Sequence, residues 1–309
     1  MRVRSARSPF RRARARRSRL TTPPPPPVSS PPSRSRQEFQ DNFALLAAHD
    51  QLRAPDVKGL RAHNFSALWH AKLVQHLQGT REWAFGDIIA WLDEPDASQL
   101  FWLMGSGGTG KTVLTAELLY RLFDRVVAWH FCRHDNAEQS SPCALLRSLA
   151  AMLCTRLPGF EAALGEVPAA LLESTDAKEV FDALLATPLS GLAPPADAKP
   201  RLVIIDALDE IPRKDQPRLL GVIANELSKL PSWLRIFTTS REEPQIKRAL
   251  SAFEPRELRA DEAKNRADVE VFLRKIAAKF VRGTMSTADI EKAANRKYGT
   301  NLNGELAEL

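Results

Sequence analysis

A glycine-rich loop between an apolar segment and an amphipathic segment constrains this chain more than any other feature. The loop consists of Gly105, Ser106, Gly107, Gly108, Thr109, Gly110, Lys111 and Thr112. It follows the apolar run Leu100–Met104, which predicts a strand, and leads into Thr112–Phe123, whose spacing predicts a helix. Glycines allow the positive φ angles that turn successive N–H groups toward a phosphate, and the helix adds its positive end. The sequence therefore predicts a phosphate-binding loop.

The last two residues of the loop separate triphosphate binding from dinucleotide binding. We expect Lys111 to reach the β- and γ-phosphates and the Thr112 hydroxyl to ligate Mg²⁺. The glycines at 105, 107 and 110 also match a dinucleotide motif, which needs an acidic residue near the end of the second strand, about twenty residues further on. The second predicted strand, Val126–Phe131, does not end in an acid. The dinucleotide interpretation also leaves Lys111 and Thr112 unexplained.

A second apolar segment ends in carboxylates. Leu202–Ile205 is apolar without alternation, as in a strand that is buried on both faces of a parallel sheet. We expect Asp206, which follows directly, to hold Mg²⁺ through its water shell, so that Lys111 and Asp206 meet at neighbouring strand tips. Asp209 and Glu210 follow one turn later, where a carboxylate can orient or deprotonate the attacking water. Spacing does not decide which of the two acts, and Glu210 is our expectation.

Strands alternate with helices from residue 100 onward, which predicts an α/β fold of the three-layer P-loop type with helices covering a parallel sheet. The predicted helices are residues 81–92, Thr112–Phe123, Pro142–Leu157, Ala177–Leu185 and Gln216–Leu230. The fourth predicted strand, Leu234–Thr238, leads to Arg241. We expect this guanidinium near the γ-phosphate, where arginine makes bidentate contacts; the alternative is an exposed arginine that caps a loop.

Composition divides the chain into four parts. Residues 1–37 contain eleven Arg, no acidic residue and five consecutive prolines, so we expect a disordered tail. Residues 38–79 are interpreted as a helical lead-in, and residues 80–245 as the P-loop core. Residues 246–309, and Asn265–Phe280 in particular, are interpreted as a helical segment that is truncated.

Charge and hydropathy exclude several classes of protein. Eleven of the 44 basic residues lie in the tail, so the remaining 33 face 37 acidic residues, a net charge of −4. Nucleic-acid binding is therefore expected only through the tail. No apolar run approaches the roughly 18 to 20 residues that span a bilayer, so we expect no membrane span. The tail is a solvated segment, an organellar transit peptide, a nuclear-import patch or a proline-rich docking segment.

The cysteines indicate a reducing compartment. Cys132, Cys143 and Cys154 are odd in number and form no C-x-x-C pair, which argues against a disulfide framework. We therefore expect a cytoplasmic protein, with organellar or nuclear targeting through the tail as alternatives. His130, Cys132 and His134 alternate as metal ligands on one strand face would, but a strand end that runs into a polar loop is our preferred interpretation.

With these residues in hand, the chain resembles the NACHT group of signal-transduction ATPases, within the STAND branch of P-loop NTPases. It looks most like the nephrocystin-like N-terminal NACHT modules, over about residues 79–241. The marks of the resemblance are Gly79-Thr-Arg-Glu-Trp83, the phosphate loop, His130-Phe-Cys-Arg-His134, Asp206-Ala-Leu-Asp-Glu210 and Thr239-Ser-Arg241. The small Ala207 after the magnesium aspartate, with acids three and four positions after Asp206, is the most specific of them.

The resemblance implies a role for each matching residue. It makes Lys111 and Thr112 ligands of phosphate and Mg²⁺, and Asp206 the magnesium partner. It makes Asp209 and Glu210 the hydrolytic acids, and Arg241 the sensor on the fourth strand. It also implies that the phosphate-loop strand lies next to the sensor strand. The implied cofactors are ATP or ADP with Mg²⁺, and adenine is favoured because the sequence has no guanine-reading N-K-x-D element.

The function expected from these features is a Mg²⁺–ATP-binding switch with slow hydrolysis, an unidentified protein partner and nucleotide-dependent self-association. Members of the group usually continue into a winged helix and a repeat array, whereas this sequence ends at Leu309. We expect either a truncated product or a sensor in another chain. The alternatives are a mechanical ATPase of the AAA-like kind, and an interaction module that binds nucleotide without hydrolysing it.

Overall fold

The computed structural model describes residues 56–258 together with Asp268 and Val271. The predicted tail (residues 1–37) and most of the segment predicted to be helical after residue 258 lie outside the described residues. Among the residues described, none of the helices combines the length and the apolar character that crossing a bilayer requires.

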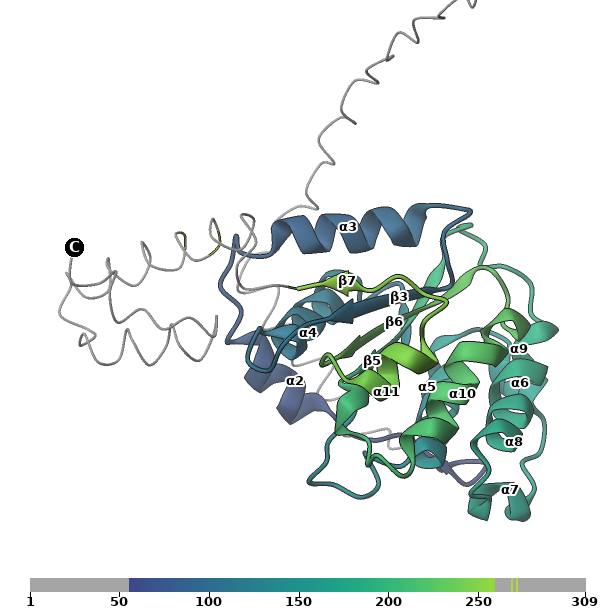
Figure 1. The fold of residues 1–309 in the computed structure, drawn as a ribbon. Coiled ribbons are helices and arrows are strands. Elements are labelled where there is room, and N and C mark those ends of the chain that lie inside the picture. Colours follow the sequence, from purple (N-terminus) through teal and green to yellow (C-terminus); the bar gives the residue numbers. More distant parts are fainter. Residues whose placement is uncertain (1–55, 259–267, 269–270, 272–309) are drawn as a thin grey trace, which may run out of the picture. The chain divides into compact units, whose positions relative to one another are not determined.

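A five-stranded parallel sheet forms the centre of the described fold, in the strand order β4-β5-β6-β3-β7 (Figure 1). The strands of this sheet are β3 (Leu100–Met104), β4 (Val126–Phe131), β5 (Arg201–Asp206), β6 (Leu234–Ser240) and β7 (Arg256–Glu257). The four predicted strands are confirmed, and most side chains of the apolar runs that predicted them are buried. The implied pairing of the phosphate-loop strand β3 with the sensor strand β6 is also confirmed.

Helices cover both faces of the sheet, as the predicted three-layer α/β fold requires. The helices are α2 (Ser66–Leu73), α3 (Glu82–Asp93), α4 (Lys111–Arg121), α5 (Pro142–Arg156), α6 (Phe160–Leu164), α7 (Ala169–Glu173), α8 (Ala177–Phe181), α9 (Thr187–Ser190), α10 (Gln216–Glu226) and α11 (Pro244–Ala249). On one face, α3 and α4 pack against the central strands, for example through Trp91 and Phe101. On the other face, apolar side chains of α5, α8 and α10 meet β5 and β6.

The predicted helices Ala177–Leu185 and Gln216–Leu230 are confirmed as helical, but neither is an α-helix throughout. A π-helical stretch, Asp182–Ala186, joins α8 to α9, and a 3₁₀ turn, Leu227–Lys229, ends α10.

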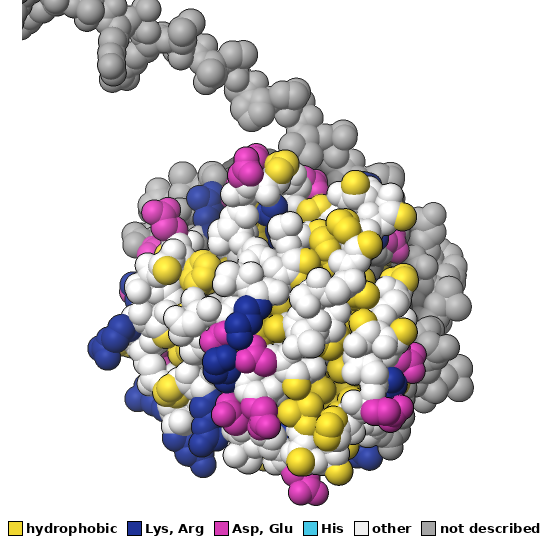
Figure 2. Space-filling model, turned by 90° about the vertical axis from the view of Figure 1, so that its right-hand side faces the viewer, with side chains coloured by type: hydrophobic (Ala, Val, Ile, Leu, Met, Phe, Trp, Pro, Cys, Tyr) yellow, Lys and Arg dark blue, Asp and Glu magenta, His cyan; other side chains and the backbone are white. Residues whose placement is uncertain are grey.

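The side of the fold that carries α6 to α9, on the right in Figure 1, faces the viewer in Figure 2. Basic and acidic side chains alternate there (Figure 2), in line with ion pairs such as Lys229–Asp182 and Lys229–Glu226.

Residues 38–79 were predicted to be a helical lead-in, and this prediction is wrong for residues 56–61, the first of them that the structure describes. These residues form an antiparallel hairpin of β1 (Asp56–Val57) and β2 (Leu60–Arg61). The turn residues Lys58 and Gly59 have φ angles of 57° and 79°, the left-handed pair that a two-residue hairpin requires. Helix α2 then begins at Ser66, so only part of the lead-in is helical.

The boundary predicted at residue 245 is also wrong, because the sheet continues beyond it. Arg256 and Glu257 form β7, which adds to the edge of β3. The N–H of Leu258 donates a 2.6 Å hydrogen bond to the Met104 carbonyl, and the Leu258 side chain is buried. A two-residue strand has too little sequence for periodicity to reveal it, since its pairing depends on a distant edge.

The carboxyl ends of the parallel strands lie at one edge of the sheet, in register. Met104 aligns with Ser240, and Phe131 aligns with Asp206. In open parallel sheets this edge is where ligands bind. Asp206 is the last residue of β5, and the other predicted site residues lie in the segments that follow β3, β5 and β6.

Candidate functional site

The glycine-rich loop connects β3 to α4 as predicted. Gly110 has a φ angle of 84° and immediately precedes the first residue of α4, a conformation that favours glycine. A Cβ atom at Gly105 would lie 2.8 Å from the Leu258 carbonyl oxygen, so that position has no room for a side chain. No side chain caps the N-terminus of α4. The backbone N–H groups of its first turn are therefore not occupied by a capping side chain.

Lys111 curls back over this loop. Its Nζ donates hydrogen bonds of 2.6 Å to the Gly105 carbonyl and 3.0 Å to the Ser106 carbonyl. Burial lowers the pKa of Lys111, while the charges of Asp209 and Asp206 oppose that shift. The ammonium group is thus enclosed at the loop and near both carboxylates.

Asp206 ends β5 with a carboxylate that is 1% exposed. Its Oδ1 accepts hydrogen bonds from the hydroxyls of Thr115, at 2.7 Å, and Thr239, at 2.8 Å. The Thr112 side chain lies near enough to the same carboxylate to lower its pKa. Burial raises the pKa of Asp206, and the three hydroxyls and the charge of Lys111 oppose that rise. The fold thus brings the helix that follows the phosphate loop into direct contact with the acidic strand end.

The two strand tips are not neighbours, which corrects one detail of the prediction. β6 lies between β3 and β5, and Thr239 on β6 bridges the gap to Asp206. The contact of Thr115 with Asp206 was not predicted, and the hydroxyl at the tip of the fourth strand was expected near the γ-phosphate, whereas Thr239 hydrogen-bonds Asp206. Thr115 lies one turn after Thr112 on α4, so helical spacing could have placed it on the same face.

Asp209 and Glu210 lie in a 3₁₀ turn, Leu208–Glu210, that follows Ala207. Arg241 holds both acids. Its backbone N–H donates a 2.8 Å hydrogen bond to Asp209 Oδ1, and its Nε lies 3.0 Å from Asp209 Oδ2. Its Nη2 lies 3.4 Å from Glu210 Oε1. A Cβ atom built on Gly107 would lie 4.0 Å from this guanidinium group. Arg241 therefore lies between the two acids and the phosphate loop.

The donor set fits a small, hard cation. Asp206 offers a carboxylate and Thr112 a hydroxyl, the oxygen ligands that Mg²⁺ uses beside phosphates and water. Within residues 56–258, 268 and 271, no group of three or more His, Cys, Asp or Glu side chains could hold a metal ion by itself.

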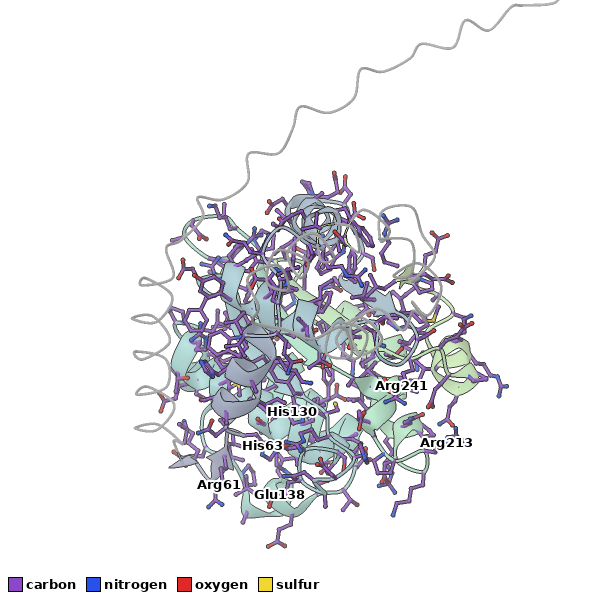
Figure 3. The ribbon with its side chains drawn as sticks, turned by 90° about the vertical axis from the view of Figure 1, so that its left-hand side faces the viewer. Arg61, His63, His130, Glu138, Arg213 and Arg241 are labelled. Atoms are coloured by element: carbon purple, nitrogen blue, oxygen red, sulfur yellow. The ribbon has the colours of Figure 1, made fainter. Side chains whose placement is uncertain are left out.

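The strand-end interpretation of His130, Cys132 and His134 agrees with the structure. β4 ends at Phe131, and a loop follows. His130 is fully buried with its ring 5.3 Å from that of His63, and the two lie next to each other in Figure 3, apart from Arg241. Burial raises the pKa of the Cys132 thiol, as do the nearby carboxylates, which disfavours a thiolate ligand.

A further connection to the loop was missed by sequence analysis. Nη2 of Arg81 donates a 3.1 Å hydrogen bond to the Thr109 carbonyl. The backbone N–H of Arg81 donates a 3.0 Å hydrogen bond to Oδ1 of Asp268, and Trp83 Nε1 donates a 3.3 Å hydrogen bond to Oδ2 of the same carboxylate. These residues link the start of α3, the phosphate loop and the segment after β7.

Comparison with known proteins gives one family. A family model described as Nephrocystin 3, N-terminal, matches residues 79–241, just over half of the chain. The match begins at the turn before α3 and ends at Arg241, so it includes the loop, Asp206 and both acids. A search of curated proteins found no match.

Proposed function

The chain belongs to the nephrocystin 3, N-terminal family, and on that premise we propose that it is a Mg²⁺–ATP-binding switch of the NACHT type that hydrolyses ATP slowly. The observation that carries the proposal is the 2.7 Å hydrogen bond from the Thr115 hydroxyl, one turn after Thr112 on α4, to the buried carboxylate of Asp206, which places Asp206 beside the start of that helix. A hydroxyl from the end of a phosphate loop and a carboxylate from a buried strand tip are the two protein groups that P-loop enzymes direct at magnesium.

The residues around this contact support a division of roles. The N–H groups of the loop and the start of α4 would bind the phosphates. Lys111, which now donates to Gly105 and Ser106, would exchange these carbonyls for phosphate oxygens. Thr112 and Asp206 would hold Mg²⁺, which supplies neutralisation of charge on the phosphates. Asp209 or Glu210 would orient the attacking water.

Arg241 supports the slow rate that we propose. An arginine at the transferred phosphate is worth about 10³ to 10⁵ in rate, but here Arg241 is bound to Asp209 and Glu210. Its guanidinium would have to leave these acids before it could contact a γ-phosphate. Turnover by the isolated chain would then be limited by that exchange of partners, which suits a switch. We also propose a cytoplasmic location, which the three free cysteines support.

Titration of the purified chain with MgATP and MgADP tests the proposal. We expect binding by the wild-type protein and no measurable binding by Lys111→Ala, because the ammonium group is the loop's only side-chain cation. Lys199→Ala, which changes an exposed lysine, is the matched control and should bind normally. Mass spectrometry of nucleotide released from the wild-type protein should identify ATP or ADP. Equal affinity of Lys111→Ala and wild type would refute the site.

A further inference from the structure

The loop after β4 contacts the acidic turn after β5. These two strands pair in parallel with Phe131 opposite Asp206, and the Cys132 N–H donates a 3.0 Å hydrogen bond to the Asp206 carbonyl. The next residues of the loop therefore lie beside the turn that contains Glu210. His134 is the residue that reaches it.

His134 binds one oxygen of the Glu210 carboxylate twice. Its backbone N–H donates a 3.2 Å hydrogen bond to Oε2 of Glu210, and its ring Nδ1 contacts the same oxygen. A carboxylate oxygen accepts hydrogen bonds, so Nδ1 carries the proton in this contact. Two donors from one residue restrict both the position and the rotation of the carboxylate, which a single flexible contact would not do.

The two acids are held differently. Arg241 binds Asp209 through its backbone N–H and Nε, and the Asp209 side chain is only 5% exposed. Arg241 reaches Glu210 through one longer contact of 3.4 Å, and Glu210 is 20% exposed. If Arg241 turns toward a phosphate, Glu210 keeps its contacts with His134.

We infer that His134 is the positioning residue for Glu210 and that it selects Glu210, not Asp209, as the acid that orients the attacking water. The inference rests on the proposed function, and it decides a choice that spacing left open. His134 acts through Glu210, which it contacts through its backbone N–H and its ring. Its side chain is 78% exposed, so replacing it removes little packing.

Single-turnover hydrolysis of bound ATP tests this role, with ATP affinity measured in parallel. We expect His134→Ala to lower the hydrolysis rate by about tenfold or more, since small misplacements of a reacting group have effects of that size, while ATP affinity stays unchanged. His134→Asn should recover much of the rate, because its amide N–H can occupy the position of Nδ1. His70→Ala, at another exposed histidine, should have no effect.

Double variants separate the two acids. In a Glu210→Gln background, His134→Ala should cause no further loss of rate, whereas in an Asp209→Asn background it should cause its full loss. The inference is overturned if His134→Ala hydrolyses ATP at the wild-type rate or faster, or if it slows the Glu210→Gln protein further. Loss of ATP binding in His134→Ala would also overturn it. A wild-type protein that binds no nucleotide would instead contradict the proposed function itself.

Discussion

The hydroxyl of Thr239, on β6, donates a 2.8 Å hydrogen bond to Oδ1 of Asp206 at the tip of β5. The same hydroxyl accepts a 2.9 Å hydrogen bond from the N–H of Ala207, which has a left-handed φ angle of 62°. Thr239 therefore holds both the carboxylate and the turn that follows it. Because the turn leads directly to Asp209 and Glu210, this one side chain couples the geometry of the proposed metal ligand to that of the acids.

Replacing Asp206 with Asn should abolish stabilisation by magnesium and nucleotide without weakening the fold. Burial raises the pKa of Asp206, so its charge opposes folding of the ligand-free protein, and Asn keeps an oxygen for Thr115 and Thr239. Urea unfolding measures the effect. With MgATP at a hundred times its Kd, the wild-type protein should gain about 2.7 kcal/mol, and the variant should gain almost nothing. An equal gain in both proteins would contradict the role of Asp206.

Replacing Arg241 with Ala should lower stability and slow hydrolysis. Asp209 would lose its contact with Nε, but Arg241 is 56% exposed, so solvent limits the expected loss in unfolding free energy to about 1 kcal/mol. Arg241→Lys keeps the charge without the planar fork and should restore stability more than rate. Arg213→Ala, at the exposed arginine labelled in Figure 3, is the control. Unchanged single-turnover rates in Arg241→Ala would exclude Arg241 from the reaction.

The buried His130 should make the protein sensitive to acid. Its Nε2 bonds the Gln139 carbonyl at 2.8 Å, so this nitrogen carries the proton of the neutral ring, and burial lowers the pKa of His130 to about 3. The unfolded chain, with a histidine pKa of about 6.5, binds more protons between these values. Stability is therefore present above pH 6.5 and is lost as the pH falls from 6.5 toward 3.

Denaturation at a series of pH values checks this prediction. The slope due to one histidine is at most about 1.4 kcal/mol per pH unit. His130→Phe should show a shallower loss in that window, and the exposed His70→Asn should follow the wild-type curve. Parallel curves for wild type and His130→Phe would show that other groups cause the acid sensitivity.

Replacing Asp268 with Ala should destabilise the start of α3. The carboxylate accepts from the backbone N–H of Arg81 and from Trp83 Nε1, and its residue is 6% exposed. Loss of an acceptor for buried donors costs about 1 to 3 kcal/mol. Thermal or urea unfolding gives the size of the loss, and amide exchange should locate it in the first turn of α3. Asp96→Ala, an exposed aspartate near the other end of α3, should behave like wild type.

Most of the sheet could be predicted from the sequence, because the central strands are short segments that are rich in apolar residues and mostly buried. Leu100–Met104 and Val126–Phe131 were predicted with their observed bounds. The hairpin at Asp56–Arg61 and the strand β7 were not. Each of their strands has two residues, too few for any periodicity, and β7 exists through its pairing with the edge of β3.

The local sequence was sufficient to predict which residues make up the candidate site. They are a glycine loop before a helix, a carboxylate at the end of a buried strand, and acids one turn later. These features follow from φ freedom, hydrophobic spacing and residue chemistry within about ten positions of the chain. The partners of these residues depended on the tertiary fold. Thr115 lies 91 residues from Asp206, His134 lies 76 residues from Glu210, and Arg81 lies 187 residues from Asp268. Such contacts arise from strand order and register, which place distant segments together and leave no periodic trace in the sequence around either partner.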